Sequence, residues 1–297
     1  MKVFTFRVRR WALAAVGCAV LLLAGIGAGT GLGRVRMASG KPESILLPAV
    51  MYHHILEDGR MLGDYVITPG QLESDMRYLR DQGYTAVLPR EVAAWVRGEG
   101  ELPEKPVLIT FDDGNRSAAV YAAPILERYG MRGTLAVIGI HSEKYTLSGD
   151  DNVAYAHASW DELKALEESG VFEIANHTYN MHEERTPRRG TLRNPGEPLE
   201  DYRAALRDDL STCQQLLEAA TGRTPTTFVY PYGFIDEAAD EVIRDLGFSV
   251  TLGVEEKVST IVRGDPETLR GIGRFNRPYS ASTETFFERV LPRNPEE

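Results

Sequence analysis

Residues 107–138, VLITFDDGNRSAAVYAAPILERYGMRGTLAVI, contain the pattern that decides the fold. The apolar run at 107–111 predicts a buried strand. Residues 117–129 have the spacing of a helix that ends at Gly130, and residues 133–138 form a second apolar run. Two apolar strands joined by a helix make a β-α-β unit, which places both strands in parallel within one sheet.

The same alternation continues on both sides of this unit. Further strands are predicted at short apolar runs: 49–55, 85–88, 172–175, 227–230, 249–252 and 269–274. The result is an α/β fold with seven to eight parallel strands. Three stretches have no regular pattern and are interpreted as long, functional loops: 139–158, 179–198 and 254–268. No glycine-rich phosphate-binding motif follows any strand, so nucleotide binding has no support.

Composition limits the partners of the chain. Of its 297 residues, 43% are hydrophobic and 26% are charged, which is typical of a globular protein. The formal net charge is −10, although residues 1–36 contain only basic charges. The rest of the chain is therefore even more acidic than the whole, and an acidic surface is a poor partner for nucleic acid.

The N-terminal segment is predicted to lie outside the folded body. Residues 11–33 contain no charged side chain and are long enough to span a membrane as a helix. Basic residues precede this run, which predicts a cytoplasmic N-terminus and a body outside the membrane. A cleaved secretory signal is the alternative, and it would release the body. We therefore predict an anchor or signal in residues 1–36, followed by a linker over 37–47.

Two adjacent carboxylates, Asp112 and Asp113, follow the buried strand at 107–111. Side by side they repel each other, so one pKa should rise unless a cation is present. An ordinary turn would also be rich in Asp and Gly. A metal ion explains the pair better, because one carboxylate can bind the ion while the other remains free to accept a proton.

A histidine pair follows another predicted strand. His177 and His182 are five residues apart, which suits a loop that presents both imidazoles to one ion rather than a single helix face. Two neutral imidazoles and one carboxylate leave coordination positions open, as in catalytic metal sites. The carboxyl ends of parallel strands meet at one face, so this pair is expected near the Asp pair.

These residues carry a family resemblance. Thr-Phe-Asp-Asp-Gly at 110–114, His-Thr-x-x-x-His at 177–182 and Tyr-Pro-Tyr-Gly at 230–233 together resemble the polysaccharide deacetylases of the NodB-homology type, carbohydrate esterase family 4. The sequence Val-Met-Tyr-His-His-Ile at 50–55 is similar to that of the extracytoplasmic poly-N-acetylglucosamine deacetylases. The resemblance implies a distorted (β/α)7 barrel, with residues 48–297 as the catalytic domain.

The resemblance also implies a metal site and a base. Asp113, His177 and His182 would bind a divalent metal, with zinc, nickel, cobalt and iron all compatible. Asp112 would be the general base. The implied reaction is hydrolysis of N-acetyl groups on an N-acetylglucosamine glycan, either an exopolysaccharide or peptidoglycan.

The family places one oxyanion-binding backbone N–H at Tyr232, in the loop that also contains Pro231. Tyr179 and Tyr232 border the metal residues and are candidates to stack on a sugar ring, although packing explains them equally well. In the exopolysaccharide subgroup, the acid that protonates the leaving amine comes from the N-terminal strand. That position corresponds to His53, with His54 as the alternative, because alternation along a strand allows only one of them to face the site.

The chain departs from the family pattern at one central position. The third motif usually begins with Arg, which orients the base, but residue 230 is Tyr. Arg274, at the end of the late predicted strand, is expected to replace it. The usual late Leu-x-His motif is also absent, and His53 would take over its function.

Two other functional classes remain open. A non-catalytic carbohydrate-binding protein on the same barrel would be expected to have lost a ligand or the base, yet all four residues are present. An O-acetyl esterase or a small-amide hydrolase would use the same chemistry, and the fold does not decide the substrate.

Overall fold

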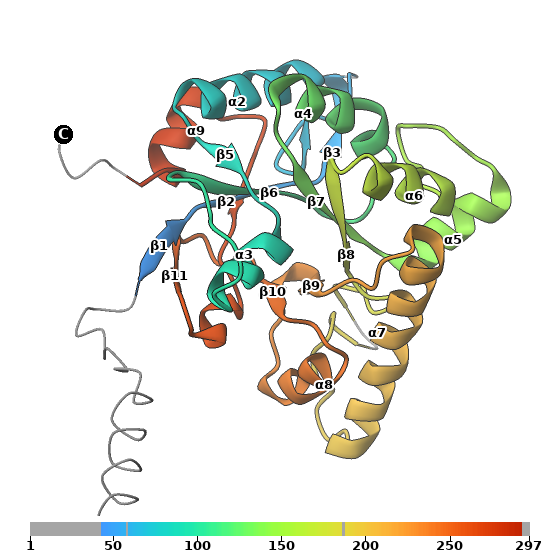
Figure 1. Cartoon of the computed structure of the whole chain (residues 1–297). Helices are drawn as coiled ribbons and strands as arrows, with labels where there is room; N and C mark the ends of the chain where they lie inside the picture. The colour runs from blue at the N-terminus through green and yellow to red at the C-terminus, as the bar shows by residue number, and fades with distance from the viewer. Residues whose placement is uncertain (1–42, 58, 186–187, 293–297) are drawn as a thin grey trace, which may run out of the picture. The chain divides into compact units, whose positions relative to one another are not determined.

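The computed structural model describes residues 43–292, except 58 and 186–187. Its central feature is an eight-stranded sheet in which every pairing is parallel. Seven strands follow the order β10-β9-β8-β7-β6-β2-β12, and β5 pairs with β6 (Figure 1). The strand bounds are β2 Ala49–Tyr52, β5 Thr85–Ala86, β6 Pro106–Phe111, β7 Gly133–Val137, β8 Phe172–Asn176, β9 Thr227–Val229, β10 Val250–Leu252 and β12 Phe275–Asn276.

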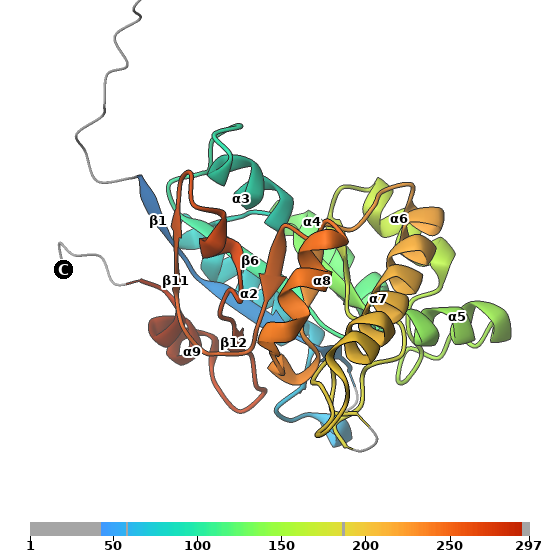
Figure 2. The same cartoon turned by 90° about the horizontal axis from the view of Figure 1, so that it is seen from below.

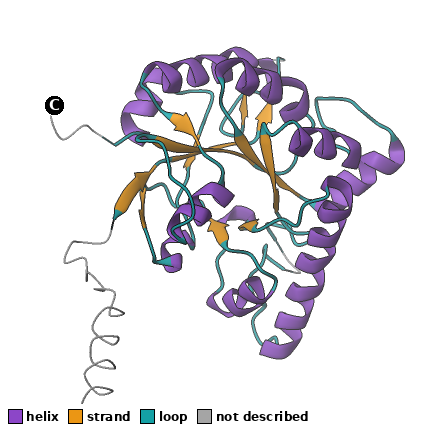
Figure 3. Cartoon of the chain, in the orientation of Figure 1, coloured by secondary structure: helices purple, strands orange, loops and turns teal. Residues whose placement is uncertain are grey.

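Helices surround the strands (Figure 3). Their bounds are α2 Pro69–Asp81, α3 Pro89–Val96, α4 Ala123–Tyr129, α5 Gly139–Ser148, α6 Trp160–Glu168, α7 Leu199–Thr221, α8 Asp240–Asp245 and α9 Thr283–Val290. A π-helical turn, Ala118–Ala122, precedes α4. Short 3-10 turns lie at Gly59–Met61, Pro231–Gly233, Glu237–Ala239 and Pro266–Leu269. The helix α5 lies within a stretch predicted to be a loop, so that prediction is wrong for residues 139–148.

The predicted β-α-β arrangement and the parallel sheet are confirmed. The sheet is curled, and its two edge strands approach each other without forming a strand ladder. An isolated parallel bridge joins Leu252 to Ile272, and the Gly253 N–H donates to the Ile272 carbonyl at 2.9 Å. The strand β12, which is the last strand of this sheet in the sequence, pairs with β2, which is the first.

The strand β6 shows why the sheet strands are continuously apolar. All six of its residues are buried. Val107, Ile109 and Phe111 face the cluster formed with the outer helices, whereas Leu108 belongs to the cluster inside the curl. A parallel strand covered on both faces needs apolar residues at every position, so it shows no polar alternation.

The N-terminal part of the body differs from the prediction. Residues 44–47, placed in the predicted linker 37–47, form strand β1 (Ser44–Leu47), which pairs antiparallel with β11 (Ser259–Val262; Figure 2). The predicted anchor or signal in residues 1–36 lies outside the described residues. Among the residues that are described, no helix has both the length and the apolar character to cross a membrane.

The predicted strand at 49–55 is divided in two. Its second part, β3 (His54–Ile55), leaves the central sheet and pairs with β4 (Val66–Ile67). His53 lies between the two strands and belongs to neither. This break turns the chain at the carboxyl end of β2, where the sequence predicted the functional residues.

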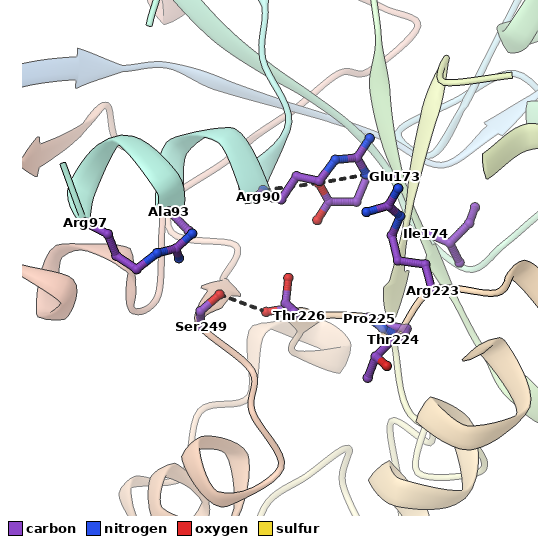
Figure 4. A pocket seen from close by; sticks show the side chains of 10 residues that line it. All are labelled: Arg90, Ala93, Arg97, Glu173, Ile174, Arg223, Thr224, Pro225, Thr226 and Ser249. Atoms are coloured by element: carbon purple, nitrogen blue, oxygen red, sulfur yellow. Dashed lines mark hydrogen bonds and ion pairs between the residues drawn. The ribbon is translucent and has the colours of Figure 1, made fainter. Parts of the chain in front are cut away.

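A cavity of about 210 Å³ lies between α3 and the amino ends of β8 to β10 (Figure 4). Glu173 is only 4% exposed there and accepts hydrogen bonds from the Thr227 hydroxyl and the Arg90 backbone N–H. The Arg90 guanidinium lies 3.6 Å from Glu173 and 3.2 Å from Glu167, and Arg223 lies 2.9 Å from Glu167. Arg90 and Arg223 thus compensate two buried carboxylates.

A buried ion pair joins the last strand to α2. The side chains of Asp75 and Arg277 are both fully buried, with Arg277 Nε 2.8 Å from Asp75 Oδ2 and Nη2 3.0 Å from Oδ1. Asp75 also accepts hydrogen bonds from the hydroxyls of Tyr52 and Thr283. Four elements, β2, α2, the segment after β12 and α9, therefore meet at one carboxylate.

We predict that Asp75→Asn lowers the free energy of unfolding by about 3 kcal/mol, because it leaves the buried charge of Arg277 without a counter-ion. Urea unfolding at pH 7 would measure this. The control is Glu73→Gln on the same helix, which removes an exposed pair with Arg128 and should change the stability little. Equal effects of the two variants would show that the buried pair is not a main source of stability.

Candidate metal centre and active site

A cleft of about 670 Å³ lies at the carboxyl ends of the sheet strands. In a parallel α/β sheet, ligands are bound at this end. Six of the eight strands contribute lining side chains, either from the last two residues of the strand or from the segment that follows it. The lining residues are Met51, His53, Tyr65, Asp112, Asp113, His177, His182, Glu184, Tyr232, Phe234, Val254, Glu256 and Asn276. The sequence-predicted Asp and His pairs are therefore brought together in one cleft.

Asp113, His177 and His182 form a compact triangle of potential metal ligands. One ligand atom from each lies within 4.8 Å of the other two. Asp113 Oδ1 lies 3.7 Å from His177 Nε2 and 3.4 Å from His182 Nε2. One carboxylate oxygen and two imidazole nitrogens suit a divalent transition metal, and three protein ligands leave positions open for water or substrate.

The hydrogen bonding of His177 prepares it to bind a metal. Its Nδ1 lies 2.8 Å from the carbonyl oxygen of Val229. A carbonyl oxygen only accepts hydrogen bonds, so Nδ1 carries the proton and the lone pair of Nε2 faces Asp113. For His182, the Tyr232 hydroxyl lies 3.3 Å from Nδ1, again leaving Nε2 toward Asp113.

Burial keeps both imidazoles neutral. It lowers the pKa of His177 to about 3, with the neighbouring His182 acting in the same direction. Burial also lowers the pKa of His182. Burial raises the pKa of Asp113 to about 6, assisted by Asp112 and opposed by His53. Neutral imidazoles are the form that binds metal, and a bound cation would favour the ionised form of the Asp113 carboxylate.

Asp112 has a different environment from Asp113, although the two residues are adjacent in the sequence. Burial acts to raise its pKa, but the charge and hydrogen bonds of Arg274 outweigh this and hold the pKa well below its ordinary range. Arg274 Nη1 lies 2.6 Å from Asp112 Oδ1, and Nη2 lies 2.9 Å from Oδ2. The expected contact between Arg274 and Asp112 is thus present, and Asp112 stays ionised.

The segment that carries Arg274 is not the strand that the sequence predicted. A 3-10 turn, Pro266–Leu269, precedes it, and β12 begins only at Phe275. The Arg274 side chain is fully buried, and its Nε donates to the Gly253 carbonyl at 2.8 Å. Tyr230, which stands where the family has Arg, instead packs in the cluster with Phe228 and Tyr202, away from the cleft.

The structure separates His53 from His54. His53 lines the cleft, and a positive charge on its ring would lower the pKa of both Asp112 and Asp113. The ring of His54 instead lies 2.8 Å from the Ser117 hydroxyl through Nδ1 and 3.0 Å from the Ala154 carbonyl through Nε2. Both His54 nitrogens are occupied, so only His53 is placed to act on a substrate.

Backbone strain concentrates around the metal triangle. Among the described residues, three that are not glycine have positive φ: Asp113 at 72°, Thr178 at 74° and Tyr232 at 56°. Such conformations cost free energy and persist only where the surrounding structure imposes them, which occurs often at functional sites. Gly114 has a φ of 76°, and a Cβ there would lie 3.3 Å from the Val137 Cα, so the turn after the Asp pair requires glycine.

Of the three predicted substrate residues, Tyr232 alone lines the cleft. Tyr232 lines the cleft beside His182, with 4.6 Å between ring centroids. Pro231 is buried beside it and does not line the cleft. Tyr179 is not among the residues that line the cleft, and its hydroxyl donates to the Glu143 carboxylate at 2.6 Å, so its contact with a sugar stays a prediction.

Sequence reasoning missed several residues of the cleft: Met51, Tyr65, Glu184, Phe234, Val254, Glu256 and Asn276. Phe234 and Asn276 lie close to predicted residues in the sequence and could have been included on that ground. Tyr65 has no such signal, because it lies in the connection between β3 and β4, and no motif marks it.

Comparison with known proteins places the chain in a family. A model of the polysaccharide deacetylase family matches residues 99–251, which is just over half of the chain and includes Asp112, Asp113, His177, His182 and Tyr232. The chain belongs to the polysaccharide deacetylase family. Its two candidate histidine ligands and its two adjacent carboxylates all lie within the matched segment.

Two curated relatives are poly-β-1,6-N-acetyl-D-glucosamine N-deacetylases. The protein of Escherichia coli (strain K12) is 26% identical over 225 residues, covering 70% of this chain and 34% of the relative. The protein of Staphylococcus aureus (strain MRSA252) is 24% identical over 207 residues, covering 70% and 67%. The chain thus spans about a third of the first relative's length and two thirds of the second's.

Solved structures support the fold. The de-N-acetylase from Aggregatibacter actinomycetemcomitans has a TM-score of 0.70 at 22% identity and covers 83% of this chain and 100% of that chain. IcaB from Ammonifex degensii has a TM-score of 0.60 at 26% identity and covers 80% and 88%. The chain therefore shares its overall fold with both of these solved structures.

We predict that Asp113→Ala and His182→Ala each retain much less divalent metal than the parent after dialysis, because each removes one of three ligands. Elemental analysis of purified protein would measure this. The control is His141→Ala, whose ring packs against His157 rather than in the triangle, and which should retain the metal. Full retention in the His182 variant would remove that residue from the ligand set.

Proposed function

We propose that the body of this protein is a metal-dependent hydrolase that removes N-acetyl groups from a polysaccharide containing N-acetylglucosamine. The observation that carries the proposal is the contrast between two adjacent carboxylates in one cleft. Asp113 faces two imidazoles, whereas Asp112 is held by Arg274. Metal-assisted hydrolysis needs both a ligand and a separate base, and this pair can supply both. Membership of the deacetylase family supports the same reaction.

The relatives favour one substrate class. Both compared proteins carry the name poly-β-1,6-N-acetyl-D-glucosamine N-deacetylase, which favours an exopolysaccharide of that kind over peptidoglycan. An O-acetyl esterase would use the same groups but would depend less on a proton donor, because an alkoxide leaves more readily than an unprotonated amide nitrogen. The position of His53 in the cleft favours the amide, because an amine is a poor leaving group until it is protonated.

The roles of the residues follow from their positions. A divalent cation held by Asp113, His177 and His182, for which zinc is our choice, would supply Lewis-acid activation of water. Asp112 accepts a proton from the attacking water, whose oxygen bonds to the acetyl carbon. The C–N bond then breaks, and the nitrogen leaves as a free amine while acetate forms.

Two further groups complete the reaction. His53 donates the proton that the departing nitrogen takes. The backbone N–H of Tyr232, in its left-handed conformation beside His182, binds the negative charge that develops on the carbonyl oxygen.

We extend the proposal to location and architecture. Residues 11–33 would anchor the body outside the cytoplasmic membrane, or direct its secretion if cleaved. The curled sheet would be the distorted (β/α)7 barrel that the family resemblance implies.

A direct assay tests the function. The protein is freed of metal, reloaded with zinc, nickel, cobalt or iron, and incubated with β-1,6-linked N-acetylglucosamine oligomers or with peptidoglycan fragments. We expect acetate release from the oligomers that depends on the added metal. Acetate release only from peptidoglycan, or from neither substrate with any metal, would overturn the proposed substrate class.

We predict that Arg274→Gln moves the acid limb of the kcat/KM profile to higher pH. Asp112 acts as a base only when ionised, so activity is lost as the pH falls through its pKa. Arg274 lowers that pKa and burial raises it, so without the guanidinium the pKa rises. Initial rates across the pH range would measure the shift.

The control for this prediction is Arg270→Gln, four residues earlier, because Arg270 lines a different pocket and does not contact Asp112. Asp112→Asn should retain the metal and lose turnover. An unchanged acid limb in a folded Arg274 variant, or near-parental rates with Asp112→Asn, would assign the base elsewhere.

We predict that His53→Ala lowers kcat on amide substrates by roughly 10²–10⁴-fold, the usual contribution of a general acid. The loss should be much smaller on an activated acetyl ester, whose leaving group needs no proton. His54→Gln is the control, because His54 lies 2.8 Å from Ser117 and points away from the cleft. Equal losses on both substrates would exclude His53 as the acid.

A further inference from the structure

One ring nitrogen of His53 has no part in the reaction proposed above. Its Nδ1 is shielded from solvent and has no hydrogen-bond partner among the described residues. A shielded atom cannot meet a substrate, so this imidazole acts in the cleft through Nε2. A histidine acid carries a proton on both nitrogens, and Nδ1 still carries one after Nε2 has given its proton away. The candidate acid therefore needs a hydrogen-bond acceptor beside Nδ1.

Asn276 has an acceptor atom that is also without a partner. Its side chain lines the same cleft, and its Oδ1 is shielded from solvent and receives no hydrogen bond within the part of the chain that the structure describes. Its Nδ2 donates to the Asp64 carbonyl at 2.8 Å. A carbonyl oxygen only accepts hydrogen bonds, so the amide nitrogen must face Asp64 and the orientation of the amide is fixed. The Asn276 Oδ1 is left to accept a bond from elsewhere.

Two sets of contacts bring Asn276 and His53 to the same place. Asn276 in β12 pairs with Met51 in β2, and His53 follows Met51 by two residues. Asn276 binds the carbonyl of Asp64, and the ring of the next residue, Tyr65, lies 4.8 Å from the His53 ring between centroids. Both side chains therefore contact the segment 64–65 and line one cleft.

The two unpartnered atoms are chemically complementary. Buried polar atoms without a hydrogen-bond partner are rare in native proteins, and each needs an explanation. One of this pair is a ring nitrogen that must carry a proton, and the other is a carbonyl oxygen that can only accept one. Hydrogen bonds at catalytic groups are often long in the free enzyme. A shift of the His53 ring toward Asn276 would satisfy both atoms with one bond.

We propose that Asn276 is a positioning residue for the candidate acid, because its Oδ1 accepts a hydrogen bond from the Nδ1–H of His53. This inference rests on the proposed function and adds to it the group that orients the acid. The bond keeps one proton on Nδ1, so the proton that His53 gives to the nitrogen of the breaking C–N bond comes from Nε2. Asn276 itself does not touch the substrate, because its Oδ1 is shielded.

The first experiment compares Asn276→Leu with the parent, both loaded with metal, on an N-acetylglucosamine oligomer and on an activated aryl acetate. We expect kcat on the oligomer to fall by roughly 10–100-fold, the range typical for outer hydrogen-bond partners of functional histidines, with little change in KM. The ester, whose leaving group needs no proton, should be hydrolysed at close to the parental rate, which also shows that the variant is folded. An unchanged kcat on the oligomer would overturn the inference.

The competing explanation is that Asn276 only ties the segment at Asp64 to β12. Asn276→Asp separates the two roles, because it keeps an acceptor oxygen and removes the donor to the Asp64 carbonyl. We expect its kcat on the oligomer to be well above that of Asn276→Leu. Equal losses in the two variants would assign the effect to the Asp64 contact and contradict the proposal.

A double variant tests whether Asn276 acts through His53. Adding Asn276→Leu to His53→Ala should slow the amide reaction no further than His53→Ala alone, because a positioning residue has no effect once the group it positions is gone. Additive losses would show that Asn276 acts by another route.

The matched control is Gln71→Leu. Gln71 also has a shielded amide oxygen without a partner among the described residues, and its Nε2 donates to the carbonyls of Tyr279 and Ala281 at 3.1 and 3.0 Å. It does not line the cleft. We expect the parental ratio of amide to ester turnover in this variant. A fall in that ratio equal to the one in Asn276→Leu would show that any loss of an amide near β12 has this effect.

Nitrogen NMR of the zinc-loaded protein with labelled histidine reads the position of the proton without any turnover. At alkaline pH, where imidazoles are neutral, we expect the proton of His53 on Nδ1 in the parent and in Asn276→Asp, and no such single tautomer in Asn276→Leu. The His53 signals are those absent from His53→Ala. A proton on Nε2 in the parent would overturn the inference. Failure of the proposed function gives a different result, because the parent would then not deacetylate the oligomer.

Discussion

The buried contact between Arg274 and Asp112 joins the segments that meet at the cleft. Arg274 belongs to the segment before β12, Asp112 directly follows β6, and the Arg274 Nε donates to the Gly253 carbonyl after β10. A fully buried guanidinium is tolerable only when its charge and donors are satisfied. The same contact therefore closes the curl of the sheet and keeps Asp112 ionised.

This contact also separates the roles of two neighbouring carboxylates. A strand end would normally give adjacent side chains opposite directions, and here the left-handed backbone at Asp113, with a φ of 72°, sets the direction of the second one. Asp112 points back to Arg274 inside the curl, and Asp113 points to the histidines. Strain at this position is compatible with stability because the fully paired β6 on one side and the Gly114 turn on the other restrict the chain.

Much of the fold and half of the cleft could be predicted from local sequence. The apolar run at 107–111 and the helix ending at Gly130 are local signals, so the β-α-β unit was predictable. The Asp and His pairs each follow a strand, and parallel strands place their carboxyl ends at one face. The pairing of β1 with β11 was not predictable, because it joins residues over 200 positions apart without a motif. For the same reason the sequence contained no sign of Tyr65 in the cleft.

Local sequence was sufficient to identify the chemical groups: two carboxylates, two imidazoles, an arginine in place of a missing one, and a histidine pair at 53–54. Composition and periodicity also determined that these groups would lie at the ends of parallel strands. The packing of distant segments was needed to show which histidine faces the cleft, that Tyr179 bonds to α5 and α7, and that Arg274 reaches Asp112. Side-chain direction at a strand end depends on the hydrogen bonds and packing of neighbouring elements, and those neighbours come from distant parts of the chain.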